Sequence, residues 1–191
     1  MARRGEFNHL VDMLERSVQR FGQRRLFGQR LEAGWRWITY ADFGAQVDEI
    51  RAGLHAIGVR RGDTVALISG NRVEWAAIAY ATYGLGARLA PMYEHQLAED
   101  WRYILNDCGA RALVVSSQEI HDRVAPWAGT LGQLATVLHM GTDAADSHSL
   151  AALRVAGRGS PEPTVALSAE EICGFIYTSG TTGRPKGVLL S

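Results

Sequence analysis

Apolar positions recur every three or four residues in the first part of the chain, which is the spacing of helices that bury one face. The first such pattern covers residues 6–21, and the second covers residues 43–57. Thr39 and Asp42 precede the second pattern with the spacing of a capping box, so a helix start is predicted there. The buried face of this second helix is expected to consist of Phe43, Val47, Ile50, Leu54 and Ile57.

Residues 26–39 lie between these helices and follow a different pattern. Trp35 and Trp37 alternate with Arg36 and Ile38, which predicts a β-hairpin. The chain holds 5 tryptophans, and most of them fall on apolar faces. Tryptophans in such positions are expected to pack in the core and not to stack on a ligand.

From residue 64 onward, short apolar runs alternate with helical patterns. Strands are predicted at residues 64–69, 88–92, 112–115 and 135–140, and helices at residues 72–84, 97–108 and 118–128. This alternation indicates strands covered by helices. The predicted fold class is therefore α/β, with a parallel or mixed sheet layered with helices.

The composition changes to Gly, Ala, Ser, Asp and Pro at residues 141–163. The interval 141–169 is therefore expected to be a loose connector, with at most one short helix around Leu150, Leu153 and Val155. Residues 172–177 are again apolar, and they predict a buried strand that contains Cys173.

Residues 177–187 combine four Ser or Thr hydroxyls, three glycines and one lysine directly after this strand. Glycines allow positive φ and a close approach to a ligand, successive amides in such a turn attract anions, and a lysine adds a point charge. The sequence thus predicts a loop that holds a phosphate chain at the carboxyl end of a strand. The candidate binding residues are Thr178, Ser179, Gly180, Thr181, Thr182, Gly183 and Lys186.

This loop is not a Walker loop, which has the pattern G-x-x-x-x-G-K-[ST]. Counting from Gly180, Pro185 occupies the second glycine position and Gly187 occupies the Ser/Thr position. A glycine-rich hairpin without a ligand would explain the glycines, but not the lysine and the hydroxyls together.

The remaining composition narrows the function classes. Lys and Arg number 20 and Asp and Glu number 20, which predicts no electrostatic recruitment by nucleic acid or by an anionic membrane surface. The N-terminus lacks the apolar region of a signal peptide, and no apolar run is long enough to span a bilayer. Cys108 and Cys173 lie in apolar patterns and are expected to be buried thiols in a reducing cytoplasm.

Other polar residues carry weaker signals. The six histidines show no metal-ligand spacing, so surface or satisfied core positions are expected. Arg60 and Arg61 predict a solvated turn. Glu94 and His95 follow a strand and stay open between a structural and a catalytic role. No Ser/His/Asp or Cys/His pattern supports a nucleophile.

The stretch at residues 177–187 resembles the signature of the adenylate-forming, AMP-binding enzymes, Y-T-S-G-[ST]-T-G-x-P-K-G, and matches every fixed position. Residues 37–43 resemble an early element of that family. Residues 71–75, 83–93 and 103–110 resemble its long-chain fatty acyl-CoA synthetase branch. The resemblance covers most of residues 7–191, although residues 94–96 depart from many relatives and leave substrate detail open.

The resemblance implies that ATP activates a fatty acid carboxylate to an acyl-adenylate, which coenzyme A then attacks. It implies that residues 178–183 bind the β- and γ-phosphates and that Lys186 acts catalytically on the departing pyrophosphate. Mg²⁺ is expected with ATP, with no metal ligand identified beyond a possible share of a Thr hydroxyl. Fatty acid, ATP and coenzyme A are the expected small-molecule partners, without nucleic acid. The expected location is cytoplasmic; peripheral membrane contact, oligomeric state and acyl chain length stay open.

Residues 1–191 are expected to form the N-terminal portion of an AMP-binding domain, without the adenine motifs and the small C-terminal domain of the family. The chain alone is therefore expected to be inactive. Two alternatives stay open: another adenylate-forming enzyme, such as a peptide-synthetase adenylation domain or an aryl or short-chain ligase, and a non-catalytic phosphate-binding module.

Overall fold

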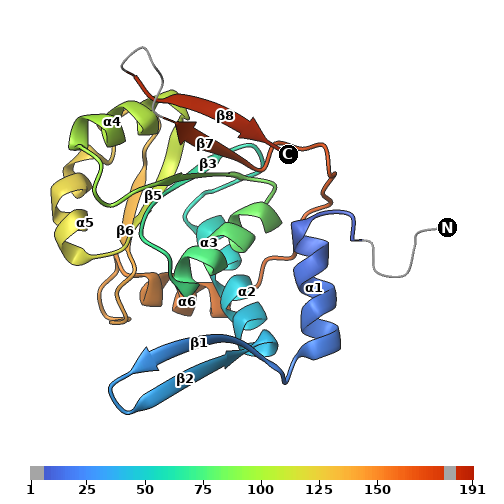
Figure 1. Ribbon diagram of the computed structural model, residues 1–191. Coiled ribbons are helices and arrows are strands. Elements are labelled where there is room, and N and C mark those ends of the chain that lie inside the picture. The colour runs from blue at the N-terminus through green and yellow to red at the C-terminus, as the bar shows by residue number, and fades with distance from the viewer. Residues whose placement is uncertain (1–6, 179–183) are drawn as a thin grey trace.

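A computed structural model describes residues 7–178 and 184–191 (Figure 1). Its helices are α1 (Leu10–Phe21), α2 (Tyr40–Ala56), α3 (Val73–Gly84), α4 (Ala98–Asp107), α5 (Gln118–Val124), the 3₁₀ helix η1 (Ala125–Trp127) and α6 (Leu150–Gly159). Its strands are β1 (Arg25–Leu31), β2 (Gly34–Thr39), β3 (Thr64–Ile68), β4 (Arg88–Met92), β5 (Ala110–Val115), β6 (Thr136–His139), β7 (Gly174–Thr178) and β8 (Lys186–Leu190).

Six of these strands form one sheet in the order β6-β5-β3-β4-β7-β8. All neighbours in it are parallel except β7 and β8, which form an antiparallel hairpin at one edge. Strands β1 and β2 form a separate antiparallel hairpin. The predicted α/β class with a mixed sheet layered with helices is confirmed.

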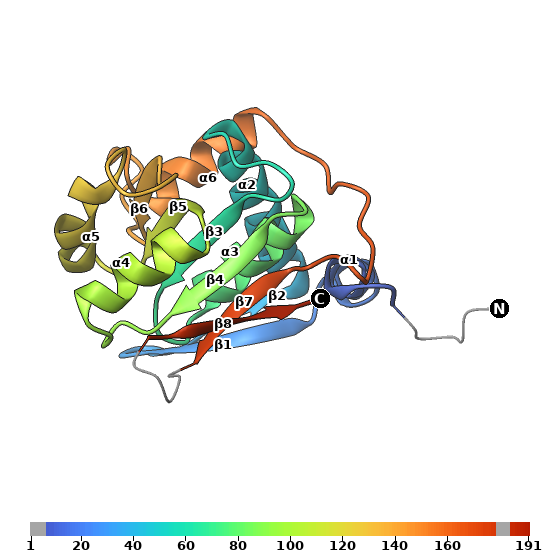
Figure 2. The same cartoon turned by 90° about the horizontal axis from the view of Figure 1, so that it is seen from above.

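Helices cover both faces of the sheet (Figure 2). One core cluster joins α2, α3 and α6 to one face, and a second joins α4 and α5 to the other. Alternate residues of β3 serve the two clusters: Val65 and Leu67 face the first, and Ala66 and Ile68 face the second. A strand that is buried on both faces needs the continuous apolar sequence seen here.

The capping box at the start of α2 is confirmed. The Thr39 side chain accepts from the backbone N–H of Asp42, and the Asp42 side chain accepts from the backbone N–H of Thr39. Of the predicted face, the residues within the helix are buried, namely Phe43, Val47, Ile50 and Leu54. Ile57 is the C-cap residue and packs half-buried against the same core.

The interval expected to be a loose connector contains α6, which packs tightly on α2. A Cβ on Gly53 would lie 2.4 Å from the Leu153 carbonyl oxygen, so the two helices approach closely only because this position is a glycine. Arg154 and Arg158 both pair with Glu49 on α2. The one short helix expected around Leu150 and Leu153 is confirmed, and both residues are buried.

Several expected boundaries are corrected. The first helix begins at Leu10 with His9 as its cap, and the helix expected at residues 118–128 becomes 3₁₀ at Ala125, beside Pro126. Val155 belongs to the short helix expected around it, on the exposed side of that helix.

The strand predicted at residues 172–177 exists but is mostly not buried. It begins at Gly174, which is its only buried residue, and Ile176 is 43% exposed. The reason is its place in the sheet, because the two core clusters extend over β3, β4, β5 and β6 and barely reach the hairpin. Cys173 is accordingly half-buried, whereas Cys108 is buried, and both thiols are free.

Two further expectations concern tryptophan and the membrane. Trp101 is fully buried, but Trp35 and Trp37 are 59% and 44% exposed, so the prediction of core packing is wrong for these two. No helix within residues 7–178 and 184–191 has the length and apolarity needed to cross a membrane.

Candidate functional site

The carboxyl ends of the parallel strands meet at one edge of the sheet. Strands β3, β4 and β5 end there and are followed directly by Ser69, Tyr93 and Ser116, and β7 ends there with Thr178. In open α/β sheets, ligands bind at this edge. The glycine-rich stretch therefore leaves the sheet where a ligand site is expected.

The β7–β8 hairpin brings the two described candidate residues together. Thr178 is the last residue of β7, Lys186 is the first residue of β8, and they are register partners. Both are exposed. The other candidates lie outside the described residues, namely Ser179, Gly180, Thr181, Thr182 and Gly183. Thr178 and Lys186 thus stand opposite one another where the phosphate-binding stretch begins and ends.

Helix α4 holds this end of the hairpin through Tyr177. The Tyr177 hydroxyl donates a hydrogen bond of 2.7 Å to Oδ2 of Asp107 at the end of α4. Burial and the bond to Asp107 both raise the pKa of Tyr177, so its hydroxyl keeps its proton and remains the donor. On the other arm, the Arg184 guanidinium lies 5.4 Å from the centre of the Tyr103 ring, also on α4.

Gly187 has a packing role and not the positive-φ role that the sequence suggested. It is a regular strand residue, absent from the described glycines with positive φ, and it pairs with Tyr177. A Cβ on Gly187 would lie 3.0 Å from Cζ of the Tyr177 ring. The bare glycine therefore lets the ring lie across β8 and reach Asp107.

Strand β4 contributes little to holding this end of β7. The only register pair between the two strands is Leu89 with Gly174, and the Leu89 N–H donates to the Cys173 carbonyl at 2.9 Å. Two residues later, the next donor on that side would come from Pro91, which has no N–H. The pairing therefore stops near the start of β7, and β8 and α4 position the end that carries Thr178.

Glu94 lies at the same edge of the sheet, but its carboxylate already accepts hydrogen bonds from neighbouring residues. Hydrogen bonds from the Ser116 side chain and the Gly70 backbone lower the pKa of Glu94, so it stands as a carboxylate between the ends of β3 and β5. Arg72 reaches the Ser116 carbonyl at 3.3 Å. These contacts favour the structural alternative for Glu94, as a link between adjacent strand ends.

The structure brings together three histidines that the sequence left scattered. The His121 ring lies 5.3 Å from that of His139 and 5.4 Å from that of His148, centre to centre. Nε2 of His139 lies 2.7 Å from Oδ2 of Asp146. Even so, no group of three or more His, Cys, Asp or Glu within the described part of the chain could hold a metal ion. Spacing in the sequence could not show this cluster because α5, β6 and a later loop each supply one ring.

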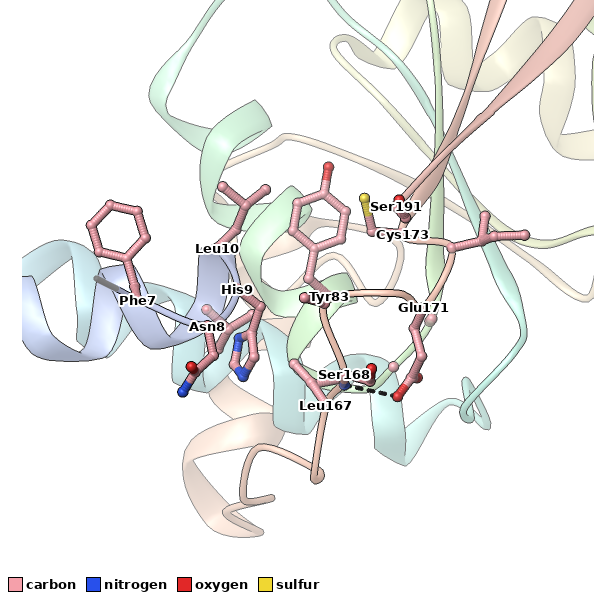
Figure 3. A pocket seen from close by; sticks show the side chains of 15 residues that line it. Phe7, Asn8, His9, Leu10, Tyr83, Leu167, Ser168, Glu171, Cys173 and Ser191 are labelled. Carbon is pink, nitrogen blue, oxygen red and sulfur yellow. Dashed lines mark hydrogen bonds between the residues drawn. The ribbon is translucent and has the colours of Figure 1, made fainter. Parts of the chain in front are cut away.

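Sequence reasoning also missed a cavity of about 300 Å³ at the opposite end of β7 (Figure 3). Its lining includes Phe7 before α1, Leu10 at the start of α1, Tyr83 near the end of α3, and Cys173 before β7. Burial raises the pKa of Tyr83 to about 12. The length of β7, roughly 13 Å at 3.3 Å per residue, separates this cavity from Thr178. It is therefore distinct from the phosphate-binding candidates.

Comparison with known proteins gives one family and related enzymes. The profile of the family described as AMP-binding enzyme matches residues 14–191. The long-chain-fatty-acid–CoA ligase FadD15 of Mycobacterium bovis is 35% identical over 167 residues, covering 85% of this chain and 28% of that protein. The chain thus spans less than a third of the length of this relative.

Solved structures agree on the fold. The anthranilate CoA ligase AuaEII, in complex with anthranoyl-AMP, superimposes with a TM-score of 0.78 at 25% identity, over 99% of this chain and 35% of that chain. Apo MatB from Rhodopseudomonas palustris superimposes with a TM-score of 0.74 at 26% identity, over 95% of this chain and 34% of that chain.

Proposed function

The chain belongs to the AMP-binding enzyme family, and from this membership we propose that the protein carrying it is a long-chain fatty acid–CoA ligase. Such an enzyme activates a fatty acid with ATP and transfers the acyl group to coenzyme A. The identity to FadD15 of Mycobacterium bovis supports the long-chain branch. Residues 1–191 would be the N-terminal portion of the AMP-binding domain, and the protein would act in the cytoplasm.

The proposed first step places a carboxylate against a polyanion. The fatty acid carboxylate attacks the α-phosphate of ATP, a P–O bond forms, and the bond to the leaving pyrophosphate breaks. The thiol of coenzyme A then attacks the acyl-adenylate and releases AMP. Because both reactants of the first step are anions, the protein must mainly position groups and neutralise charge.

The observation that carries this proposal is the pairing of Thr178 with Lys186 at the mouth of the hairpin. Residues 179–185 connect them, so the ends of the connection are fixed side by side. We assign the amides and hydroxyls of residues 178–183 to the β- and γ-phosphates. We assign the Lys186 ammonium, on its long stem, to the departing pyrophosphate.

Mg²⁺ is compatible with this arrangement. It usually keeps several waters and binds phosphate oxygens with one or two protein ligands, so the absence of a three-ligand cluster among the described residues is no obstacle. A Thr hydroxyl of the loop would be its contact with this chain. When bound, Mg²⁺ would neutralise charge on the phosphates.

The test of the proposal is ATP–pyrophosphate exchange by the whole protein, with and without Lys186→Ala. One charge-assisted contact contributes about 1.5–3 kcal/mol, so the substitution should lower the exchange rate about ten- to a hundredfold. Arg184→Ala is the matched control, because it removes a neighbouring cation that lies over Tyr103. Equal losses from both substitutions would assign the effect to general charge and contradict the role of Lys186.

The similarity to an anthranilate CoA ligase favours one alternative, an aryl-acid ligase. The same exchange assay with long-chain, short-chain, aryl and amino acids separates these enzymes by which acid supports exchange. Exchange with none of them would point to a non-catalytic phosphate-binding module. We expect the 191-residue chain alone to bind nucleotide weakly and to form no acyl-CoA, and acyl-CoA formation by it would contradict this expectation.

A further inference from the structure

The β1–β2 hairpin forms a ribbon with two unlike faces, and it lies apart from the six-stranded sheet (Figure 1). Its inner face packs on the core through Phe27 and Ile38, which are register partners. The Phe27 ring meets the ring of Phe43 on α2 edge-on, with 5.1 Å between centres. Since side chains alternate between faces along a strand, Trp35 and Trp37 belong to the other face.

This other face carries exposed indole rings next to arginines. The Trp35 and Trp37 rings stack with 5.8 Å between centres and 24° between planes. The Arg25 guanidinium lies 4.9 Å from the centre of the Trp37 ring, and Arg30 is the register partner of Trp35. We name these four residues the tryptophan face: Arg25, Arg30, Trp35 and Trp37.

The ribbon is basic although the chain as a whole is neutral. Residues 25–39, which form the ribbon, contain three arginines and a single acidic residue, Glu32, so their formal charge is +2. Within the described residues, Arg25 and Arg30 form no ion pair. Whole-chain charge balance therefore conceals a local cationic surface with two unpaired guanidinium groups.

We propose that the tryptophan face binds the interface of an anionic phospholipid membrane. An indole ring is apolar with one N–H donor, and tryptophan is enriched where hydrocarbon meets headgroups. Arginines beside the rings match the negative charge of lipid phosphates within about a Debye length of the surface. An apolar patch alone would not match the lipid phosphates, and a cationic patch alone would not match the boundary between hydrocarbon and headgroups.

The alternative partner with the same chemistry is single-stranded nucleic acid, which also uses aromatic and basic side chains. Here the Trp37 ring is already packed: it contacts Trp35 and Arg25, and it lies close enough that a Cβ on Gly28 would be 2.8 Å from its Cζ3. A base would have to displace these contacts to stack on it. A membrane surface needs only the exposed ring edges and leaves the contacts in place.

The inference does not rest on the proposed enzyme activity, so its test uses binding alone. The whole protein is mixed with phosphatidylcholine vesicles, with and without phosphatidylglycerol, and bound protein is measured by flotation. We expect binding to the anionic vesicles. Trp35→Ala with Trp37→Ala should weaken it about tenfold through lost apolar contact. Arg25→Gln with Arg30→Gln should weaken it about fivefold for each arginine, and only on anionic vesicles.

Leu97→Ala is the matched control, because Leu97 is 63% exposed but lies outside the ribbon. It should leave vesicle binding unchanged, and circular dichroism checks that every variant is folded. Absence of binding to anionic vesicles would overturn the proposal, as would equal losses from the control and either double variant. A single-stranded oligonucleotide that binds more tightly than the vesicles, and loses binding with the same double variants, would assign the face to nucleic acid instead.

Discussion

Both hairpins of this chain pair an aromatic residue with a glycine on the opposite strand, but the aromatic ring has different contacts in each hairpin. In β7–β8, Gly187 lies directly across from Tyr177, and in β1–β2, Gly28 lies directly across from Trp37. In both hairpins the aromatic ring lies over the bare glycine, at a distance that a Cβ would make too short. In each pair, the aromatic ring covers the backbone of the glycine opposite it.

The difference lies in what holds each ring. The Tyr177 hydroxyl is bonded to Asp107, so the ring is tied to α4 and its hairpin is tied with it. Residue Trp37 is 44% exposed, and the neighbours of its ring on the ribbon are the side chains of Trp35 and Arg25. The glycine–aromatic pair therefore helps to fix the β7–β8 hairpin to α4, whereas in the β1–β2 hairpin it leaves the aromatic ring exposed to solvent.

The segments that connect the two strands of each hairpin also differ, in length and in the groups they carry. Residues 179–185 join β7 to β8, whereas only Glu32 and Ala33 join β1 to β2. In the first hairpin the candidate chemistry lies at the strand ends, with Thr178 and Lys186, and in the connection between them. In the second the turn is minimal, and the candidate binding groups lie on the strands.

Substitution of Gly187 by valine should have the largest effect, because the fixed Tyr177 ring cannot move aside. Its Cβ would lie 3.0 Å from Cζ and 3.2 Å from the hydroxyl oxygen of Tyr177. Overpacking of this kind costs about 1–3 kcal/mol, or about 3–10 °C in Tm for a chain of this size. Because the next pair is Thr178 with Lys186, exchange activity of the whole protein should also fall about tenfold or more.

Two controls accompany Gly187→Val. Gly159→Ala adds a Cβ where no atom lies within 4 Å, and it should leave Tm unchanged. In a Tyr177→Ala background the ring is gone, so the added cost of Gly187→Val should largely disappear. Additive costs in this double-mutant cycle would show that the ring is not the cause.

Tyr177→Phe should have a smaller effect, because the ring stays and only its hydrogen bond to Asp107 is lost. A bond to a carboxylate contributes about 1.5–3 kcal/mol when buried, and partial exposure of this hydroxyl reduces the expected loss to about 1 kcal/mol. Exchange activity should fall about fivefold, with a modest fall in Tm. Tyr103→Phe is the control on α4, since the Tyr103 hydroxyl has no hydrogen-bond partner among the described residues. Equal effects from both substitutions would contradict the anchoring role of Tyr177.

Local signals in the sequence predicted much of the fold. The capping box at Thr39, the buried face of α2 and the apolar strand β3 depend on residues close together in the chain, and the structure confirms them. The alternation of these elements was enough to predict an α/β sheet. The phosphate-binding stretch was recognisable for the same reason, since its residues are contiguous.

Local signals could not predict the contacts between segments that are far apart in the sequence. The bond between Tyr177 and Asp107 joins residues 70 positions apart, and the link from Glu49 to Arg154 joins residues 105 positions apart. The exposure of Trp35 could not be predicted either, because alternation shows that a strand has two faces but not which face meets the core. That choice is made by Phe27 and Ile38, which pack toward α2.

Gly28→Val should have the smallest effect, although its steric contact is the shorter one. A Cβ on Gly28 would lie 2.8 Å from Cζ3 of Trp37, against 3.0 Å at Gly187, so contact distance alone predicts the larger cost here. We expect the reverse order, because no hydrogen bond to another element holds the Trp37 ring among the described residues, so the ring can shift within its contacts to Trp35 and Arg25. Valine also gains in strand propensity and in loss of unfolded-state freedom. The change in unfolding free energy should stay within about 0.5 kcal/mol, measured by urea denaturation beside Gly187→Val. A cost at Gly28 equal to or above that at Gly187 would show that Trp37 is held as firmly as Tyr177, and the contrast between a fixed and a displayed ring would be wrong.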